Sequence, residues 1–271
     1  MAQLNNQVVG LIRFSYLAKS GGWNIKVSNE THKEELFSKQ RMALRFRLFE
    51  TLTVPSLLYQ TDKDFKCIVL CSDQMPEAFT KRLIDCLEGH DNLIFMALPP
   101  LPHHRAAAMA FERLKNETAQ LFTGFRLDDD DMLQKTYIEN LKDKIERAGP
   151  FIEPNKPLIT SFNFGLFLEK TKAGNKVFDV IERTPGAQGT AMTTYINESR
   201  TIFSRNHRKL PAYFRTISHI DGPAWLRTVH SNNIAAPKIT GRDHLIEQDR
   251  VAQLLYAHFG LSMDMVSALK L

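Results

Sequence analysis

The spacing of apolar residues in the first half of the chain alternates between two periods. Short apolar or alternating runs predict strands over residues 7–14, 65–71, 92–98 and 121–127. Apolar residues three or four positions apart predict helices over residues 40–58, 77–87 and 104–120. A further helix is predicted from Leu133, Tyr137, Leu141 and Ile145, and it ends at Gly149-Pro150. Strands separated by helices indicate βαβ units and a mostly parallel sheet.

The pattern changes after a proline-containing loop at residues 151–157. Residues 160–169 and 176–182 flank an Ala-Gly-Asn turn and predict an antiparallel hairpin. A loop over residues 185–189, a strand over 225–230 and an amphipathic helix over 243–259 follow. We expect this half to extend the same sheet and to add a region that covers the substrate, without forming a separate domain.

Composition places the chain among ordinary globular proteins. It has 271 residues, of which 43% are hydrophobic and 24% charged, enough for a large core. The net charge of +5 suits an anionic partner such as a nucleotide, a phosphorylated lipid or a nucleic acid, without selecting among them. Cys67, Cys71 and Cys86 show neither metal-binding spacing nor an even-numbered disulfide framework. With no leader-like start and no membrane-length apolar run, we expect a cytoplasmic protein without a transmembrane segment.

Four consecutive aspartates, Asp128 to Asp131, lie between the strand predicted at 121–127 and the helix that follows. Like charges this close repel, so a folded chain needs something to offset them. Full solvation, a helix N-terminus or a bound cation could each do so. Asp is a favoured N-cap, and the helix dipole stabilises acidic residues by roughly 0.3–1 kcal/mol each, which accounts for one or two of the four.

The position of the run favours a ligand site, although the cap remains an alternative. Ligands of open α/β sheets bind beyond the carboxyl ends of the strands, where these side chains emerge. Carboxylate oxygens suit Mg²⁺ or Mn²⁺, and Mg²⁺ typically takes one or two carboxylates together with substrate phosphates. An isolated Ca²⁺ loop is a third alternative, and the ligand spacing of an EF-hand is missing.

Three ordered segments carry a resemblance to a known family. They are FETLTVPSLLYQTD at residues 49–62, FRLDDDD at 125–131 and WLRTVHSNN at 225–233. An apolar strand that ends in Asp-X-Asp resembles glycosyltransferases of the GT-A fold, and the ordered set is most similar to a bacterial family described as putative rhamnosyltransferases. The resemblance runs from about residue 8 to residue 233. It implies one GT-A-like domain over residues 1–271, with a nucleotide-sugar-binding half at 1–150 and an acceptor-side half at 151–271. That fold is a Rossmann-related mixed sheet flanked by helices, with the hairpin as an extension of the second half.

The resemblance also implies roles for individual residues. Asp128 and Asp130 match the outer positions of Asp-X-Asp and would hold Mn²⁺ or Mg²⁺, with His230 as a further metal ligand and Asn233 supporting it. Residues implied to contact the nucleotide sugar are Arg13, Asp73, Arg105, Asp129 and Asp131. From the residues alone, a histidine on a strand such as His230 is more often a hydrogen-bonded core or surface residue, and Arg105 at a helix start is more often a solvated side chain. Asp73 could equally cap a turn.

The activity implied is a metal-dependent transfer of a sugar from a nucleoside diphosphate to a glycan or lipid-linked acceptor. The family name suggests rhamnose from its deoxythymidine diphosphate form, and such an enzyme would work in the cytoplasm or at the periphery of the inner membrane. An inverting transfer needs a general base. Residues 185–197 contain no carboxylate where inverting enzymes of this fold commonly place one, which leaves Asp221, Glu182 and Asp131 as candidates.

Two other functions stay open. A non-catalytic nucleotide-sugar-binding module of the same fold is supported by the missing acidic pair. A nucleic-acid-binding protein would use the surplus positive charge, but the basic residues are scattered and lack interleaved aromatic residues, so we expect no nucleic-acid partner.

Overall fold

The computed structural model describes residues 5–19, 29–230, 233 and 239–271. Most of its strands belong to one seven-stranded sheet with the order β10-β6-β9-β4-β1-β2-β3. Its strands are β1 (Asn6–Arg13), β2 (Lys66–Ser72), β3 (Leu93–Leu98), β4 (Leu121–Leu127), β6 (Leu158–Phe162), β9 (Ala191–Tyr195) and β10 (Arg215–His219). All run in one direction except β9, which is antiparallel to both neighbours. The mostly parallel sheet predicted from the periodicity is therefore confirmed.

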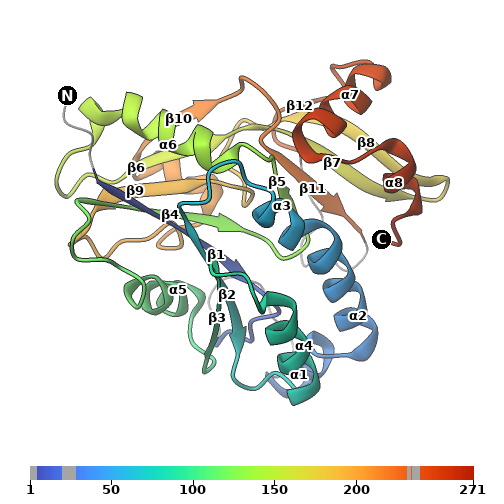
Figure 1. Ribbon diagram of the computed structural model, residues 1–271, viewed down its shortest axis with the longest axis horizontal. Coiled ribbons are helices and arrows are strands. Elements are labelled where there is room, and N and C mark those ends of the chain that lie inside the picture. The colour runs from blue at the N-terminus through green and yellow to red at the C-terminus, as the bar shows by residue number, and fades with distance from the viewer. Residues whose placement is uncertain (1–4, 20–28, 231–232, 234–238) are drawn as a thin grey trace.

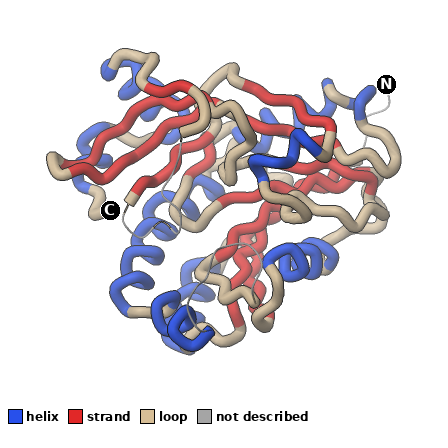
Figure 2. The backbone as a smooth tube through the Cα atoms, turned by 180° about the vertical axis from the view of Figure 1, so that it is seen from behind, coloured by secondary structure: helices blue, strands red, loops and turns tan. Residues whose placement is uncertain are grey.

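The second half of the chain extends that sheet with β6, β9 and β10, as predicted, but the hairpin belongs to a second sheet with the order β12-β8-β7-β11-β5. Its strands are β5 (Met132–Leu133), β7 (Phe164–Thr171), β8 (Gly174–Ile181), β11 (Trp225–Val229) and β12 (Arg242–Asp243). Figure 2 shows these strands apart from those of the first sheet. The chain crosses between the sheets at the buried Asn163, whose amide donates to the carbonyl oxygen of Glu182 at 2.9 Å. Residues on both sides of Asn163 are buried, so the apolar pattern continues through the crossing and hides it.

Helices flank the sheets in the order that Figure 1 labels. They are α1 (Asn29–Leu36), α2 (Lys39–Leu48), α3 (Val54–Leu58), α4 (Glu77–Leu87), α5 (His103–Glu112), α6 (Tyr137–Arg147), α7 (Gln248–Phe259) and α8 (Met263–Ala268), with a π-helical turn at Phe49–Thr53 and short 3₁₀ turns at Gly149–Phe151 and His207–Ala212. In the described part of the chain, none of these helices has the length and apolar character needed to cross a bilayer. The helix predicted over 40–58 is confirmed as α2, the π turn and α3 in direct succession.

Two predicted helices are shorter than expected, and side-chain hydrogen bonds to the backbone explain both ends. The helix predicted to reach residue 120 ends at Glu112, because Asn116 accepts a hydrogen bond from the backbone N–H of Thr118 and forms a competing turn. The last long helix begins at Gln248, five residues later than expected. Before it, the carboxylate of Asp179 accepts hydrogen bonds from the backbone N–H groups of Leu245 and Ile246.

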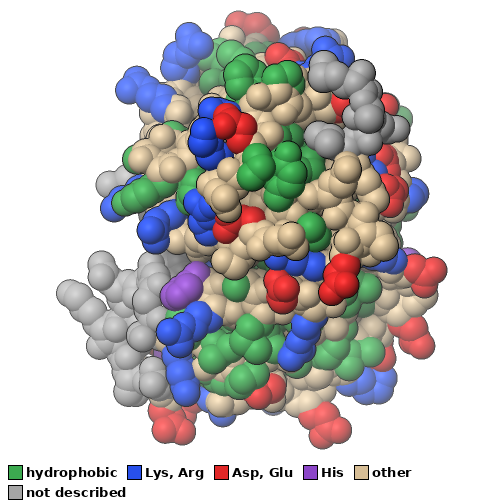
Figure 3. All heavy atoms as spheres, turned by 90° about the vertical axis from the view of Figure 1, so that its left-hand side faces the viewer, with side chains coloured by type: hydrophobic (Ala, Val, Ile, Leu, Met, Phe, Trp, Pro, Cys, Tyr) green, Lys and Arg blue, Asp and Glu red, His purple; other side chains and the backbone are tan. Residues whose placement is uncertain are grey.

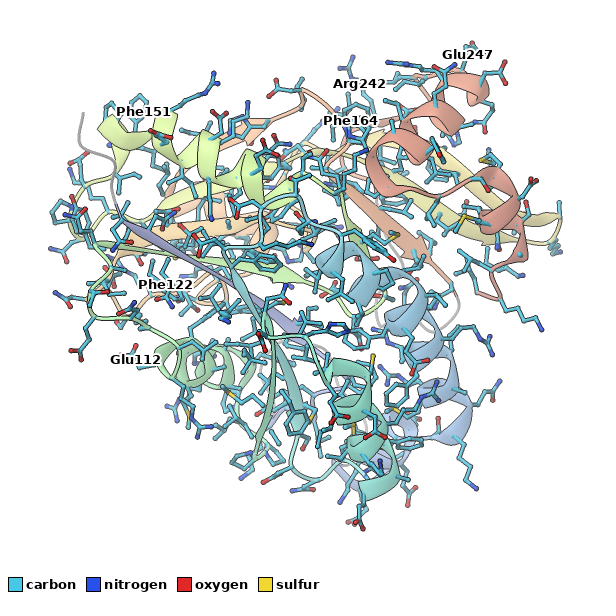
Figure 4. The ribbon with its side chains drawn as sticks, in the orientation of Figure 1. Glu112, Phe122, Phe151, Phe164, Arg242 and Glu247 are labelled. Carbon is cyan, nitrogen blue, oxygen red and sulfur yellow. The ribbon has the colours of Figure 1, made fainter. Side chains whose placement is uncertain are left out.

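Alternate residues of the central strands face two separate apolar layers, as the pleat of a strand requires. On one face, Val9 and Leu11 of β1 pack with residues of α5. On the other, Val8 and Ile12 pack with residues of α2, α4 and α6. Figures 1 and 4 show α5 on one side of these strands and α4 on the other, with Phe122 of β4 on the α5 side. The central sheet is therefore covered by helices on both faces, as the α/β prediction expects.

A third apolar layer joins the second sheet to α7 and α8, and it includes Leu48 and Leu52 from the continuous helix α2–α3. The same helix contributes Met42 and Phe46 to the layer beneath the first sheet. It therefore packs against both sheets at once. This position orients Arg41 and Arg45, one turn apart on α2, toward the space where the two sheets meet.

We expect Gly165→Ala to destabilise the fold. A Cβ at this position of β7 would lie 2.1 Å from the indole ring of the buried Trp225, whose Nε1 donates to the carbonyl oxygen of Phe162. Overpacking of this kind costs about 1–3 kcal/mol in the free energy of unfolding, measured by urea denaturation. Gly149→Ala is the matched control, since its Cβ would meet no atom within 4 Å. Equal stability of the two variants would contradict the packing described.

Candidate functional site

The acidic run joins the two sheets. It follows the last residue of β4 and leads directly into β5, and α6 begins only at Tyr137. Two of the explanations considered for the run are therefore wrong. Asp129, Asp130 and Asp131 are 2–3% exposed, which excludes full solvation, and six residues separate Asp130 from the first turn of the helix. Leu133, expected in that helix, lies in β5.

The charge that offsets the run comes from Arg45 of α2. Its Nη2 and Nε donate to the two carboxylate oxygens of Asp129, the second at 3.3 Å, and its Nη1 donates to Asp130 Oδ2 at 2.5 Å. Arg45 is buried with them. Burial alone would lower the pKa of Arg45, but the two carboxylates raise it by more, so the guanidinium stays charged. A planar guanidinium that meets two carboxylates is the strongest kind of ion pair that side chains form.

Asp130 also contacts His230 and Asn233, which lie beyond the end of β11. His230 Nε2 lies 3.0 Å from Asp130 Oδ2, and Asn233 Nδ2 donates to the same oxygen at 3.2 Å. Asn233 Oδ1 in turn accepts from the backbone N–H of His230 at 2.7 Å. Burial raises the pKa of Asp130, but Arg45 and His230 outweigh it, and the pKa falls below its ordinary value. Asp130 is therefore ionised in the folded protein.

Asp131 is held differently from its neighbours. It accepts hydrogen bonds from the backbone N–H of Thr228 at 2.9 Å and from Gln188 Nε2 at 2.7 Å. Burial and the adjacent charge of Asp130 raise the pKa of Asp131 well above its ordinary value. Because its two oxygens are engaged with β11 and with the loop before β9, Asp131 connects the sheets.

A cavity of about 150 Å³ opens beside the run, and both acidic and basic side chains line it. Asp128, Asp129 and Asp130 form one edge. The basic lining residues are Arg13, Arg41, Arg45, Arg227, His32 and His103. Asp128 is the most exposed acid of the run, with a side chain 32% accessible. Four arginines and three aspartates of the lining leave a surplus of one positive charge beside this acidic edge.

The structure brings together some of the residues predicted for the site. Asp128, Asp129, Asp130 and Arg13 line the cavity, and His230 contacts Asp130. Arg13 at the end of β1 lies 3.8 Å from Asp128 and donates from Nη1 to His103 Nδ1 at 3.0 Å.

Asp73 and Arg105 are exposed and lie outside the lining of the cavity. Asp73 follows the last residue of β2. Burial raises the pKa of Tyr16, a residue that lines the cavity, and the charge of Asp73 adds to this rise. Their roles stay predictions.

The three candidates for the catalytic base lie apart from the cavity lining. Asp221 is exposed and pairs with Lys144 at 2.8 Å. Glu182 is buried and accepts from the backbone N–H of Thr240 at 2.7 Å. Asp131 is engaged as described above. None of them lines the cavity in the part of the chain that the structure describes, so no candidate gains support from its position.

Arg45, Arg41 and His103 are site residues that the sequence prediction missed. A signal for Arg45 was present, because it lies on the apolar face of its helix, three residues after Met42 and four before Phe49. A charged residue in an apolar stripe is buried only with a partner. The spacing does not identify that partner, which is Asp129, 84 residues further along the chain.

The donor types of this site fit a divalent cation at one point. In the described residues no three carboxylate, imidazole or thiol groups converge. The oxygen of Asp130 and the nitrogen of His230 are nevertheless 3.0 Å apart, with the Asn233 amide beside them. Neighbouring ligands of an octahedral Mg²⁺ are about 3 Å apart, since each lies about 2.1 Å from the ion. Arg45 Nη1 donates to the same oxygen of Asp130, so Arg45 would compete with a cation for that oxygen.

Comparison with known proteins places the chain among the glycosyltransferases. It belongs to the family described as "Putative rhamnosyl transferase", whose sequence model matches residues 7–242. The comparison with curated proteins finds no match.

Solved structures similar in fold include Staphylococcus aureus TarS 1–349 in complex with UDP-GlcNAc, at 10% identity and a TM-score of 0.47, covering 95% of this chain and 74% of that one. Another structure of TarS 1–349 has 10% identity and a TM-score of 0.43, and covers 82% of this chain and 60% of that one. A "putative nucleotide-diphospho-sugar transferase" from Desulfovibrio desulfuricans G20 has 10% identity and a TM-score of 0.40, with coverages of 83% and 81%. The chain thus spans about 60% of the length of one TarS 1–349 structure.

We expect Arg45→Met to lower the free energy of unfolding by about 3–5 kcal/mol, because it leaves Asp129 and Asp130 buried without their counter-charge. Urea denaturation at pH 7 measures the difference. Arg47→Met, two residues further on the same helix and exposed, is the control and should change stability by less than about 0.5 kcal/mol. A similar loss in both variants would argue against the ion pair.

We also expect His103 and His207 to contribute a loss of stability as pH is lowered from 7 to 5, against the opposite contribution from the raised pKa of Asp131. Burial, with the nearby arginines, lowers the pKa of His103 to about 3 and that of His207 to about 2. Between these values and the ordinary pKa of about 6.5, the unfolded chain binds more protons than the folded one, so acid favours unfolding.

Each of these two histidines contributes at most about 1.4 kcal/mol per pH unit. His103→Asn keeps an acceptor for Arg13 and removes one titrating group. The loss of unfolding free energy that the histidines cause between pH 7 and 5 should therefore be smaller in this variant than in the unmodified protein. An unchanged slope in urea titrations would contradict the neutral state of His103.

Proposed function

We propose that this glycosyltransferase depends on Mn²⁺ or Mg²⁺ and transfers rhamnose from a nucleoside diphosphate, the deoxythymidine form being the first candidate, to a glycan or lipid-linked acceptor. The family supports the class of reaction and suggests the sugar. The observation that carries the metal dependence is the meeting of Asp130 and His230 at 3.0 Å, on the acidic edge of the cavity. The acidic edge suits the cation of a cation–diphosphate complex, and the arginines of the cavity suit its diphosphate.

In this proposal Asp130 and His230 hold the cation, and Asn233 orients both through its amide. The cation, when bound, acts as a Lewis acid for the departing diphosphate. Asp128, the exposed acid of the run, faces the donor and completes the acidic edge. Arg13, Arg41 and Arg227 line the cavity and attract the anionic donor.

Asp129 and Asp131 act as positioning residues. Asp129 is joined to Arg45, and Asp131 to Thr228 and Gln188, so neither side chain is free to turn toward a substrate without breaking a buried contact. Their contribution is to fix the backbone from which Asp128 and Asp130 project. The acceptor approaches from residues of the second half of the chain, which contribute Arg227 and Asn233 to the lining.

A second candidate function is a nucleotide-sugar-binding module without turnover. Its support is the position of Glu182 and Asp221, since neither candidate base lines the cavity. A nucleic-acid-binding function finds no such support. On the face shown in Figure 3, basic side chains are dispersed among acidic and apolar ones and do not form a stripe. Transfer or hydrolysis of a nucleotide sugar separates the enzyme from the binding module.

We expect Asp130→Asn to lower the Mn²⁺-dependent release of nucleoside diphosphate from its sugar conjugate by at least about 100-fold, because an amide is a neutral and weaker ligand. EDTA should abolish the same release by the unmodified protein, and added Mn²⁺ should restore it. Asp85→Asn, exposed on α4, is the control and should keep the full rate. Activity that persists in EDTA would rule out the metal dependence, and absence of any release with Mn²⁺ would favour the binding module.

A further inference from the structure

Arg126 is a buried cation whose Nε has no hydrogen-bond partner in the part of the chain that the structure describes. It lies on β4, two residues before Asp128, and is 7% exposed. Its Nε has no hydrogen-bond partner within residues 5–19, 29–230, 233 and 239–271, and Asp128 Oδ1, at 4.0 Å from Nη2, is beyond hydrogen-bonding distance. Burying a charged group without such a partner is unfavourable by several kcal/mol. The folded protein keeps Arg126 charged and buried, so the position is suited to an anion that the chain itself does not supply.

The groups around Arg126 add positive charge. Arg13 approaches the same oxygen of Asp128, at 3.8 Å, so two guanidinium groups face one carboxylate and leave a net charge of +1. The ring of Phe203 lies against both, with its centroid 5.0 Å from Arg126 Cζ and 5.4 Å from Arg13 Cζ. The aromatic ring contacts both guanidinium groups without using their N–H donors, of which Arg13 Nη1 donates to His103.

The other charged and titratable neighbours do not cancel this surplus. Burial, only partly offset by Asp128 and reinforced by Arg13 and Arg227, lowers the pKa of Arg126 to about 10, so the side chain is still cationic at neutral pH. His103 and His207 are neutral there, because burial and these arginines lower the pKa of both. Neutral imidazoles add hydrogen-bonding capacity without adding charge.

This group is separate from the ion pair of Arg45. Arg45 contacts Asp129 and Asp130, whereas Arg126 and Arg13 share the single, partly exposed Asp128. Strands of the first half of the chain supply both arginines, and the second half supplies Phe203. The surplus of positive charge therefore lies where the two halves of the chain meet, next to the cavity lined by Arg13 and Arg227.

We propose that Arg126 and Arg13, held against Phe203, form an oxyanion site that binds a phosphoryl group of a substrate without a metal ion. Two forked guanidiniums match the oxygens of a phosphate group. The proposal rests on the proposed function only in assigning that phosphate to a substrate of the transfer. Two sources share this chemistry, the diphosphate of the donor and a phosphate carried by the acceptor.

Titration with inorganic phosphate and with pyrophosphate in EDTA, followed by calorimetry and thermal unfolding, tests the site. The unmodified protein should bind both anions and unfold at a higher temperature in their presence. Arg126→Met should lose at least tenfold in affinity for both and should unfold at a higher temperature than the unmodified protein when no anion is present. Arg113→Met, the same change at an exposed position at the end of α5, should bind as the unmodified protein does.

Two further variants keep the test decisive if Arg126→Met folds poorly. Arg13→Gln and Phe203→Leu should each weaken phosphate binding, the first by removing a guanidinium and the second by removing the ring that orients both. Unaltered phosphate affinity in Arg126→Met or, where that variant does not fold, in both of these would overturn the proposal. So would the absence of phosphate binding by the unmodified protein.

Competition with a nucleoside diphosphate in EDTA assigns the source. Displacement of phosphate by the nucleotide identifies the donor diphosphate as the occupant, and simultaneous binding with additive thermal shifts identifies a phosphate on the acceptor. Either outcome supports the oxyanion site. Failure of every donor in the transfer assay would remove the proposed function and leave phosphate binding by Arg126 unaffected, so the two failures are distinguishable.

Discussion

The contact of Arg45 with Asp129 and Asp130 is the interaction on which the rest of this structure depends. Four adjacent acids join the two sheets, and three of them are buried. Such a link is tolerable only with a positive charge in contact, because unpaired carboxylates strongly resist removal from water. Arg45 supplies that charge from a helix that packs against both sheets. The ion pair therefore positions the helix, the link and the edge of the cavity together.

This arrangement divides the cavity into regions of different charge balance. Around Asp129 and Asp130 two carboxylates contact the single guanidinium of Arg45, and a cation that binds there competes with Arg45. Around Asp128 the balance is reversed, because Arg13 and Arg126 exceed the single carboxylate between them. The proposed function requires a cation and an anionic diphosphate to bind together, and the two regions suit these two requirements.

Much of the fold could be predicted from the sequence, because its signals are local. The strand at 121–127 and the helix at 77–87 match β4 and α4 residue for residue, since each has a clear apolar period and a clear end. Errors arose where a distant contact decides the outcome. The sequence pattern places the hairpin in the first sheet because apolar residues continue across Asn163. It does not mark β9 and β10, since these strands pair only within the completed sheet.

By itself, the sequence determined the α/β class, the position of the acidic run after a buried strand and, through three ordered segments, the family. These depend on residues that are neighbours along the chain, or on motifs whose order is preserved. Only the tertiary structure decided which charge offsets the run. Arg45 and Asp129 are 84 residues apart, and only the folded arrangement buries the Nε of Arg126 with no hydrogen-bond partner among the described residues. Electrostatic energy depends on distance and burial in space, and neither quantity is defined until the chain has folded.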